Sequence, residues 1–386
     1  PRAGRRSLGR WAGCARGTLL LSLVGCEGPA EDSGTPLKPG ELQQVATRSC
    51  PAPGPLSWRD RAEEFGLEGT DHAVDHFEGG AVALDDVDAD GTLDLVLAMP
   101  ASPVRLYPAL GSGRASEIVG GMAPMAFLRW DVDEDGGADL VITGPMPSLL
   151  MRRQGHYEEE QLPGFDLSTL VALHGSSVLK QLVPFDADQD GDLDLYGPVN
   201  PGSGTVDPES VDDVVLFREG PLDWRTVELP AVLAGTRPFD AAVVDRNGVD
   251  ALYVANDMGA QFGGNQLFVG SAEGVEDITE DCGCGLVESA MADEVADVNA
   301  DGLEDIVIGS TFRSLLLLDT GDGRYVDASA STGVSKFPDG RSMSWAVSAE
   351  DFDNDGRMDI VIPQGDFRPQ GGGDIYESPI NALWQR

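Results

Sequence analysis

The chain has 386 residues, of which 41% are apolar, and it contains 49 Gly and 25 Pro. This length suits one large domain or two ordinary ones, and the composition excludes a largely disordered chain. The net charge of −40 argues against binding to nucleic acid or to anionic lipid headgroups, because such partners require clustered Lys and Arg.

The first 25 residues differ from the rest of the chain, because they hold five Arg and no acidic residue. They end in a short apolar run, Thr18–Gly25, which is too short to span a bilayer, since a span takes about 20 apolar residues. A basic segment followed by such a run is typical of a signal peptide. The segment Leu23-Val-Gly-Cys26 resembles the bacterial lipobox, in which the cysteine receives a diacylglycerol.

We therefore predict an exported lipoprotein of the cell envelope, lipidated at Cys26 and held at the outer membrane or cell surface. The alternative is an ordinary secretory signal with an incidental cysteine. Residues 26–55 are polar and rich in Pro and Gly, which predicts a flexible tether leading to a folded domain over residues 56–386. Export places the chain in an oxidising compartment, where we expect a local Cys282–Cys284 disulfide; a bridge from either cysteine to Cys50 is the alternative.

Six related Asp-rich segments follow along the chain. Their first aspartates stand at positions 86, 131, 186, 245, 297 and 351. Five copies are full, with acidic or amide residues at positions 1, 3, 5 and 9 of the motif and Gly at position 6. The fourth copy, Asp245–Asp250, is shortened and lacks one of these acidic or amide residues. A repeat of this length is typical of the blades of a propeller.

Each repeat can be divided into four short strands. The first and second flank the Asp-rich segment, as Ala81–Leu84 and Leu93–Leu97 do in the first copy. The third and fourth follow a turn, as Gln266–Val269 and Gly274–Thr279 do in the fourth copy. Short strands at regular spacing predict an antiparallel all-β fold. We therefore predict a β-propeller with six visible four-stranded blades, or seven if C-terminal sequence is missing.

The Asp-rich segments predict calcium sites. Carboxylates at positions 1, 3, 5 and 9 supply hard oxygen ligands, and the Gly at position 6 allows a tight turn. Without a cation, so many carboxylates in nine residues repel one another. Mg²⁺ is disfavoured because it keeps its waters. A single copy could be a solvated acidic turn, but five copies at blade spacing argue against that reading.

We predict about five Ca²⁺ ions per chain and a metal-free tight turn at the fourth copy. The predicted ligands are Asp86, Asp88, Asp90, Asp94, Asp131, Asp133, Asp135, Asp139, Asp186, Asp188, Asp190, Asp194, Asp297, Asn299, Asp301, Asp305, Asp351, Asp353, Asp355 and Asp359.

This pattern resembles the FG-GAP/VCBS repeat family, whose members form β-propellers with Ca²⁺ in these loops. Within it, the chain is most similar to the group related to cartilage acidic protein, which often carries an ASPIC/UnbV segment. Segments that look like the linking motifs of that group are Tyr253–Asp257, Asn265–Phe268, Gly321–Asp327 and Asn381–Trp384. The resemblance covers residues 56–386 and implies fold and metal strongly, but adhesion or extracellular-ligand binding only loosely.

Catalytic motifs are absent from the sequence. The four His residues form no metal-ligand array, there is no Gly-x-Ser-x-Gly elbow, and Gly371–Gly373 lacks a following Lys-Ser/Thr. We therefore favour a calcium-stabilised binding or adhesion module, whose partner is an extracellular protein or glycan, over an enzyme. The alternatives are a calcium-dependent propeller enzyme acting on polysaccharide or a phosphate ester, and a purely structural envelope protein.

The ends of the repeat array predict how the ring closes. The last repeat supplies three strands, the third at Ala382–Trp384, whereas Leu56–Leu67 precedes the first repeat without a partner. We predict that Ser57–Arg61 pairs beside Ala382–Gln385 as the outer strand of the last blade. Deletion of residues 50–66 should then destabilise the whole ring. A seventh blade beyond Arg386 is the alternative.

Overall fold

The structure is a computed structural model. It describes residues 81–87, 90–98, 103–108, 116–119, 124–153, 156–162, 164–165, 178–200, 213–220, 223–228, 236–246, 248–271, 274–311, 313–335, 342–352, 356–366 and 380–384. The predicted signal peptide, the tether and Cys26 lie outside these residues, as do Ser57–Arg61 and its predicted pairing at the ring closure.

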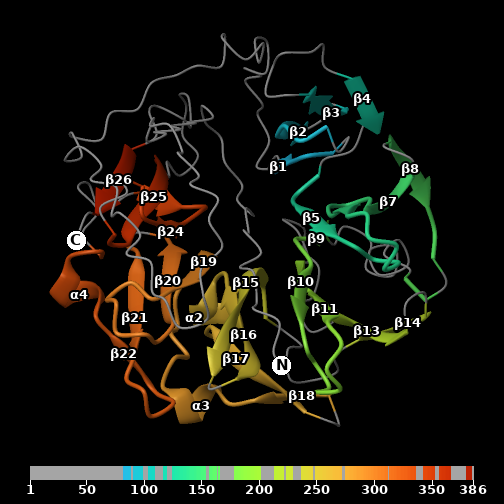
Figure 1. Ribbon diagram of the computed structural model, residues 1–386. Coiled ribbons are helices and arrows are strands. Elements are labelled where there is room, and N and C mark those ends of the chain that lie inside the picture. Colours follow the sequence, from blue (N-terminus) through green and yellow to red (C-terminus); the bar gives the residue numbers. More distant parts are fainter. Residues whose placement is uncertain are drawn as a thin grey trace, which may run out of the picture.

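Five four-stranded antiparallel sheets follow one another around an arc, and each is a meander of strands in chain order (Figure 1). These are the blades. Blade 1 consists of β1 (Ala81–Asp85), β2 (Asp94–Ala98), β3 (Val104–Tyr107) and β4 (Ser116–Val119), and blade 2 of β5 (Phe127–Trp130), β6 (Asp139–Ile142), β7 (Ser148–Arg153) and β8 (His156–Glu160). Blade 3 consists of β10 (Val183–Phe185), β11 (Asp194–Gly197), β13 (Val214–Gly220) and β14 (Asp223–Glu228).

Blade 4 consists of β15 (Pro238–Arg246), β16 (Val249–Asn256), β17 (Gln266–Ser271) and β18 (Gly274–Asp277). Blade 5 consists of β19 (Ala290–Ala296), β20 (Asp305–Ser310), β21 (Leu315–Asp319) and β22 (Tyr325–Asp327). First strands of consecutive sheets contact one another from β10 to β24 and between β1 and β5, so they line the inside of the arc. The all-β propeller predicted from the repeats is confirmed.

The predicted number of blades is wrong, because five sheets have blade order and the last sheet does not. In that sheet β23 (Ser342–Ser344) and β24 (Ser348–Glu350) both pair with β25 (Asp359–Asp366), and β26 (Ile380–Trp384) pairs with the other side of β25. The break between β23 and β24 faces Pro363 in β25. Proline has no N–H to donate to a ladder, and an interruption of the partner strand is its usual consequence. The prediction that Ala382–Trp384 forms the third strand is confirmed, since it belongs to β26.

The interruption between β23 and β24 is one case of a register shift that four consecutive sheets share. In blades 4 and 5 the register between the first two strands shifts by one residue, at Phe239 and Met291. The same shift separates β9 (Val178–Leu179) and β12 (Val199–Asn200) from blade 3, between Leu179 and Val183. In the last sheet it falls between Ser344 and Ser348. Phe239 and Met291 stand six positions before an Asp-rich segment. Lys180 and Trp345 stand at the same offset within the other two shifted stretches, so the shift repeats with the motif.

Side chains from three of these shifted stretches lie close together. The Nζ atom of Lys180 lies 4.1 Å from the ring centroid of Phe239, and the ring of Phe239 lies 5.6 Å from that of Trp345. Phe239 belongs to blade 4 and Trp345 to the last sheet, so their contact joins two sheets that are not consecutive along the chain. We call these three residues the hub.

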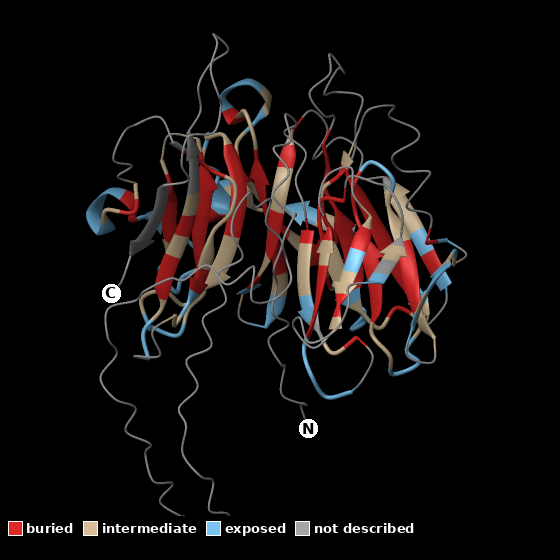
Figure 2. Ribbon diagram, turned by 90° about the horizontal axis from the view of Figure 1, so that it is seen from above, coloured by how far each residue is buried: buried red, intermediate tan, exposed pale blue. Residues whose placement is uncertain are grey.

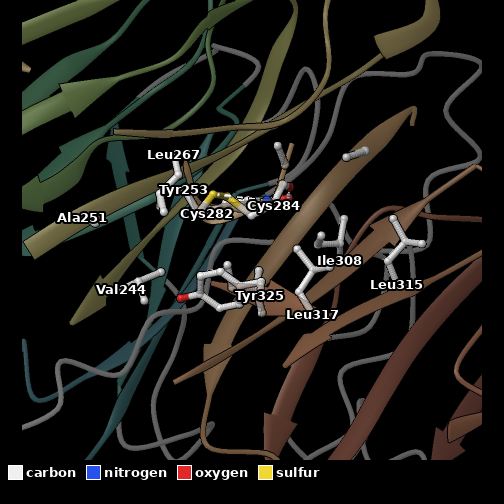
Figure 3. Close-up of a cluster of buried hydrophobic side chains, with 13 residues drawn as sticks. Val244, Ala251, Tyr253, Leu267, Cys282, Cys284, Ile308, Leu315, Leu317 and Tyr325 are labelled. Carbon is white, nitrogen blue, oxygen red and sulfur yellow. Dashed lines mark hydrogen bonds between the residues drawn. A yellow bond between two sulfur atoms is a disulfide. The ribbon is translucent and has the colours of Figure 1, made fainter. Parts of the chain in front are cut away.

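The core lies between the sheets. Figure 2 shows buried residues along the middle of the strands, with exposed residues at the loops. Figure 3 shows one buried cluster, in which side chains of blades 4 and 5 interlock. Its members include Tyr253 and Leu267 from blade 4 and Ile308 and Leu317 from blade 5, all fully buried. Burial of such side chains at about 25 cal/mol per Å² is the main term that holds neighbouring blades together.

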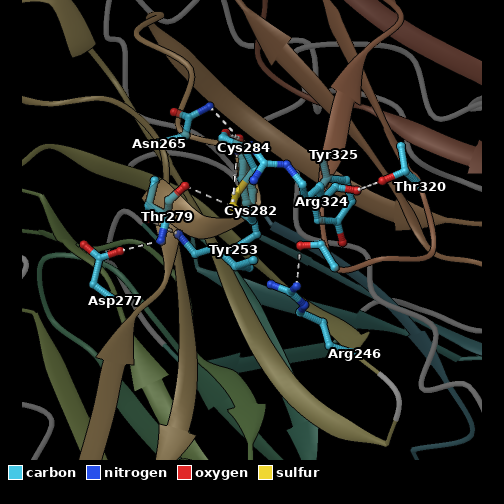
Figure 4. Close-up of a disulfide and its surroundings, with 12 residues drawn as sticks. Arg246, Tyr253, Asn265, Asp277, Thr279, Cys282, Cys284, Thr320, Arg324 and Tyr325 are labelled. Carbon is cyan, nitrogen blue, oxygen red and sulfur yellow. Dashed lines mark hydrogen bonds between the residues drawn. A yellow bond between two sulfur atoms is a disulfide. The ribbon is translucent and has the colours of Figure 1, made fainter.

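The disulfide Cys282–Cys284 forms, as predicted, and is buried in the same cluster (Figure 4). The Tyr253 hydroxyl donates to the Cys284 carbonyl at 3.3 Å and accepts from the Asn265 amide at 3.0 Å. The Asn265 side chain in turn accepts the Asn256 N–H at 3.0 Å. These contacts explain why the segments Tyr253–Asp257 and Asn265–Phe268 occur together: they fix the turn between two strands of blade 4.

The helices within the described residues are short. They are α2 (Gly259–Phe262), α3 (Thr279–Cys282) and α4 (Ser329–Thr332). None of the helices in this part of the chain is long and apolar enough to cross a membrane.

Candidate functional site: the repeated acidic loops

The Asp-rich segments form loops between first and second strands, where the sequence predicted them. We number them by repeat: loop 1 (86–94), loop 2 (131–139), loop 3 (186–194), loop 5 (297–305) and loop 6 (351–359). Loops 1, 2, 3 and 5 connect the first two strands of blades 1, 2, 3 and 5, and loop 6 connects β24 to β25.

Loops 2, 3 and 5 share an unusual backbone. Position 4 is left-handed although it is not Gly, with φ of 57° at Glu134, 61° at Gln189 and 61° at Ala300. Position 6 is also left-handed, with φ of 89° at Gly136 and 101° at Gly191. Non-glycine residues seldom adopt this conformation, so its recurrence shows that the motif imposes one loop geometry on different side chains.

The aspartate at position 9 fastens each loop to the blade. In loop 2, the Asp139 carboxylate accepts the Val132 N–H at 2.8 Å and the Arg152 N–H at 2.8 Å. In loop 3, the Asp194 carboxylate accepts the Ala187 N–H at 2.8 Å and the Arg218 N–H at 2.8 Å. Position 9 therefore joins the start of the loop to the third strand of the blade.

Other loops repeat this arrangement. Asp94 accepts the Val87 N–H at 2.9 Å, and Asp305 accepts the N–H groups of Val298 at 3.1 Å and Asp319 at 3.0 Å. The sequence predicted this aspartate only as a metal ligand. Its structural role was missed, because the third strand that supplies the second N–H lies more than ten residues away in the chain.

The hydrogen bonding of the aspartate at position 1 is the best indication of a cation site. One of its oxygens accepts the N–H of the Gly at position 6, at 3.0 Å between Asp131 and Gly136. The other oxygen, Oδ1, is buried and has no hydrogen-bond donor within the described chain in Asp86, Asp131 and Asp186. A buried carboxylate oxygen without a partner is costly, and a bound cation would satisfy it. The residues present therefore fit a calcium ion.

Two loops bring several carboxylates together. Oxygens of Asp131, Asp133 and Asp139 lie within 4.8 Å of one another, as do those of Asp186, Asp188 and Asp194. In loop 5 the side-chain oxygen of Asn299 is also buried without a donor among the described residues. Carboxylate and amide oxygens at this separation can share one Ca²⁺.

The electrostatics of loop 3 show the cost of leaving it without a cation. Burial raises the pKa of Asp194 to about 6, and the nearby Asp188 and Asp190 carboxylates add to this rise. Burial also raises the pKa of Asp186 and Asp188, and again neighbouring carboxylates contribute. Burial likewise raises the pKa of Asp305 in loop 5, to about 6. A cation would remove this penalty, because it favours the ionised carboxylates.

The loops also lie at the joints between blades. The Val132 carbonyl of loop 2 accepts a hydrogen bond from the Arg218 guanidinium of blade 3 at 3.3 Å, and Arg218 forms an ion pair with Glu134 at 3.1 Å. The Ala187 carbonyl of loop 3 accepts the Ser271 N–H of blade 4 at 3.2 Å. Ser271 and Arg218 hold equivalent places in their blades, so both loops brace the next blade in the same way.

The fourth copy forms a tight hairpin turn, as predicted. Asp245 pairs with Asp250 and Arg246 with Val249 across the ladder of β15 and β16. The Arg246 guanidinium donates to the Gly323 carbonyl of blade 5 (Figure 4). A side chain thus makes the joint to the next blade where the acidic loop is missing. Whether this turn is free of metal stays a prediction.

The structure describes most of the predicted ligands. All four predicted ligands of each of loops 2, 3 and 5 are among the described residues. Asp88 of loop 1 and Asp353 and Asp355 of loop 6 lie outside the described residues.

Arg153 and Glu219 were missed by the sequence analysis. They follow the residues whose N–H groups bind position 9 in blades 2 and 3, so they lie beside the loops. A strand register is needed to find them, and the motif alone does not supply one.

Comparison with protein families matched residues 297–362 to the FG-GAP-like repeat. The predicted resemblance to FG-GAP repeats is thus confirmed for this stretch, which includes loop 5 and loop 6; the finer grouping with cartilage acidic protein stays a prediction. Comparison with curated proteins gave no match.

Among solved structures, the chain is similar to an Agrocybe aegerita lectin described as recognising non-reducing terminal N-acetylglucosamine (15% identity, 74% of this chain and 76% of that one, TM-score 0.42). It is also similar to BBS1N in complex with ARL6DN (12% identity, 73% and 75%, TM-score 0.44). A third similar structure is the V. cholerae biofilm matrix protein Bap1 (12% identity, 74% and 65%, TM-score 0.40). At these TM-scores the likenesses carry no conclusion about function.

Proposed function

We propose that this protein is a calcium-stabilised binding module of the cell envelope. Its calcium ions hold the acidic loops, and the loops hold one blade to the next. The observation that carries the calcium part is the buried Oδ1 atom of Asp86, Asp131 and Asp186, which has no donor within the described chain. When bound, Ca²⁺ would supply this oxygen with a partner and neutralise the carboxylates around it.

The chain's own residues determine what the ion would do. Position 9 already fastens each loop through backbone N–H groups, so the loop is shaped before a ligand arrives. Positions 1, 3 and 5 would then hold the ion in a preformed turn. Because the carbonyls of Val132 and Ala187 contact the next blade, an ion that rigidifies these loops also stabilises the joint.

Removal of calcium tests this part of the proposal. We expect the melting temperature to fall in excess chelator and to recover with CaCl₂, since a ligand at 100 times its Kd stabilises the folded state by about 2.7 kcal/mol per site. Metal analysis should find about five Ca²⁺ per chain. MgCl₂ at the same concentration is the control and should restore much less. A melting temperature that chelator leaves unchanged would contradict a structural role for calcium.

Attachment to the envelope is predicted from the sequence alone, so it is tested separately from calcium binding. Cys26→Ser should release the protein from the membrane fraction or block its maturation, and Cys50→Ser is the matched control. Unchanged detergent partitioning of the Cys26→Ser protein would indicate ordinary secretion.

The ligand is the least specified part of the proposal. A binding module should retain an extracellular glycan or peptide on an array in the presence of calcium and should leave it chemically intact. We would screen polysaccharides and phosphate esters for turnover with the same preparation. Calcium-dependent turnover would replace the binding module by a propeller enzyme, and neither binding nor turnover would favour a purely structural envelope protein.

A further inference from the structure

Loop 2 differs from loop 3 in one respect: the guanidinium of an arginine forms ion pairs with its carboxylates. The Nη1 atom of Arg153 lies 2.8 Å from Oδ2 of Asp133 and 3.3 Å from Oδ2 of Asp135, at positions 3 and 5. The other side of the guanidinium faces Glu160, with Nε 2.9 Å from Oε1. These hydrogen bonds, first those with Glu160, raise the pKa of Arg153, so its positive charge is permanent.

The Asp133 side chain is only 10% exposed, so this ion pair is shielded from solvent more than an ordinary surface pair. Exposed pairs contribute little because water and salt screen them. A partly buried guanidinium that bridges two loop carboxylates offsets part of the repulsion that a metal ion would otherwise offset.

The equivalent place in blade 3 carries the opposite charge. Arg152 and Arg218 donate their N–H groups to position 9 of loops 2 and 3, so the next residues, Arg153 and Glu219, correspond. Glu219 forms an ion pair with Arg225 at 2.6 Å. Burial and then the Asp190 carboxylate raise the pKa of Asp188 at position 3; Glu219 adds to this rise and Arg225 opposes it. Blade 5 has the uncharged Thr320 at this place.

We propose that Arg153 is a built-in counter-cation of loop 2, which offsets the repulsion among its carboxylates without calcium and makes this loop bind calcium more weakly than loop 3. The inference rests on the proposed function, since it presumes that the loops bind calcium. A calcium ion at Asp133 and Asp135 has to displace the guanidinium, which then remains with Glu160. Loop 2 therefore fills after loop 3 as calcium rises, and the joint between blades 2 and 3 depends less on calcium than the joint between blades 3 and 4.

The first experiment removes the charge. We expect Arg153→Gln to raise the calcium affinity of loop 2 about tenfold or more, because a unit positive charge within a few ångströms of the ion is lost. The same variant should have a lower melting temperature in chelator than the unmodified chain. Its melting temperature should also rise more when calcium is added. Arg152→Gln is the matched control: it removes the same charge one residue away, and its side chain makes no ion pair with a loop carboxylate among the described residues.

Terbium can assign the change to loop 2. Trp130 directly precedes this loop, and Tb³⁺ takes the oxygen ligands of Ca²⁺, so indole-sensitised emission reports on an ion held there. Arg153→Gln should give this emission at lower Tb³⁺ than the unmodified chain. Trp130→Phe in the Arg153→Gln background should weaken it.

The reverse exchange keeps the inference testable if Arg153→Gln folds poorly. Glu219→Arg should install the guanidinium beside loop 3, lower its calcium affinity and reduce the loss of stability in chelator. Equal calcium affinity and terbium response in Arg153→Gln and the unmodified chain would overturn the inference and leave the calcium proposal standing. An equal fall in melting temperature with and without calcium would also overturn it, since Arg153 would then only pack. Calcium binding at no loop would overturn the calcium proposal first, and this inference with it.

Discussion

Loops 2 and 3 have the same backbone conformation, but the residue at the equivalent place on the neighbouring third strand is an arginine in one case and a glutamate in the other. Both have left-handed residues at positions 4 and 6, and both bind two backbone N–H groups through position 9. Beside loop 2 stands Arg153, which bridges two of its carboxylates, and beside loop 3 stands Glu219. The difference teaches that the motif sets the shape of a loop, whereas a residue on the third strand sets how much that loop requires a cation.

The largest effect should come from the feature that the two loops share. Asp194→Ala and Asp139→Ala each leave two N–H groups without an acceptor in a buried place. An unpaired buried donor costs about 1–3 kcal/mol, so each variant should lose roughly 2–6 kcal/mol in urea unfolding. Asp192→Ala, at an exposed position of loop 3, should change stability by less than about 0.5 kcal/mol. A clear difference between the two position-9 variants would break the equivalence of the loops.

Replacing the aspartate at position 1 should affect the stability of loops 2 and 3 differently when calcium is present. Asp186→Asn removes a charge from a cluster in which burial raises the pKa of several carboxyls, so it should leave the chelated protein as stable or more stable. With calcium it should cost about 1–3 kcal/mol, because the ion loses a charged ligand. Asp131→Asn should cost less with calcium, since loop 2 holds its ion more weakly. Urea unfolding of both variants, each with CaCl₂ and with chelator, measures the four free energies of unfolding.

Acid should change stability in opposite directions with and without calcium. Because burial raises the pKa of Asp194 and Asp305 to about 6, the folded chelated protein binds protons more tightly than the unfolded chain. These groups contribute stability that is fully present below about pH 4, the unfolded value, and is lost as the pH rises through about 6. Chelated protein should thus become more stable from pH 7 to pH 5. With calcium it should become less stable, because protons compete with the ion; a fall in both conditions would contradict the raised values.

The smallest effect should come from the turn glycines. Gly136 and Gly191 have φ of 89° and 101°, and a Cβ added at either would meet no atom within 4 Å. Alanine there costs only the strain of the left-handed backbone, about 1–2 kcal/mol. Gly136→Ala and Gly191→Ala should therefore lower the urea midpoint by similar amounts. A much larger loss at Gly191 would show that loop 3 tolerates less distortion than loop 2.

The sequence predicted the features that depend on residues close together in the chain. Ala81–Leu84 and Gln266–Val269 were expected as strands and lie in β1 and β17, because the apolar pattern beside each acidic segment repeats. The Cys282–Cys284 disulfide was also expected, since two residues so close in sequence meet without help from the fold. The tight turn of the fourth copy followed from its missing residues.

The sequence could not predict what depends on register. The break between Ser344 and Ser348 required knowing that Pro363 lies opposite. The second partner of position 9, and the place of Arg153 beside Asp133, required knowing how the third strand aligns with the loop. Composition marks an acidic loop but says nothing of which side chain a neighbouring strand brings to it.

The meander order of the blades has a consequence for how the chain folds. Each blade joins strands that are adjacent in sequence, as in β1 to β4 within residues 81–119, so its contacts have low contact order. Chains with such contacts close short loops first and fold quickly, and domains form from the N-terminus as synthesis proceeds. Blades can therefore form in turn, each on the one before it. The contact between Phe239 and Trp345 spans more than a hundred residues, so it can form only when the last sheet is present, and it marks the completed assembly.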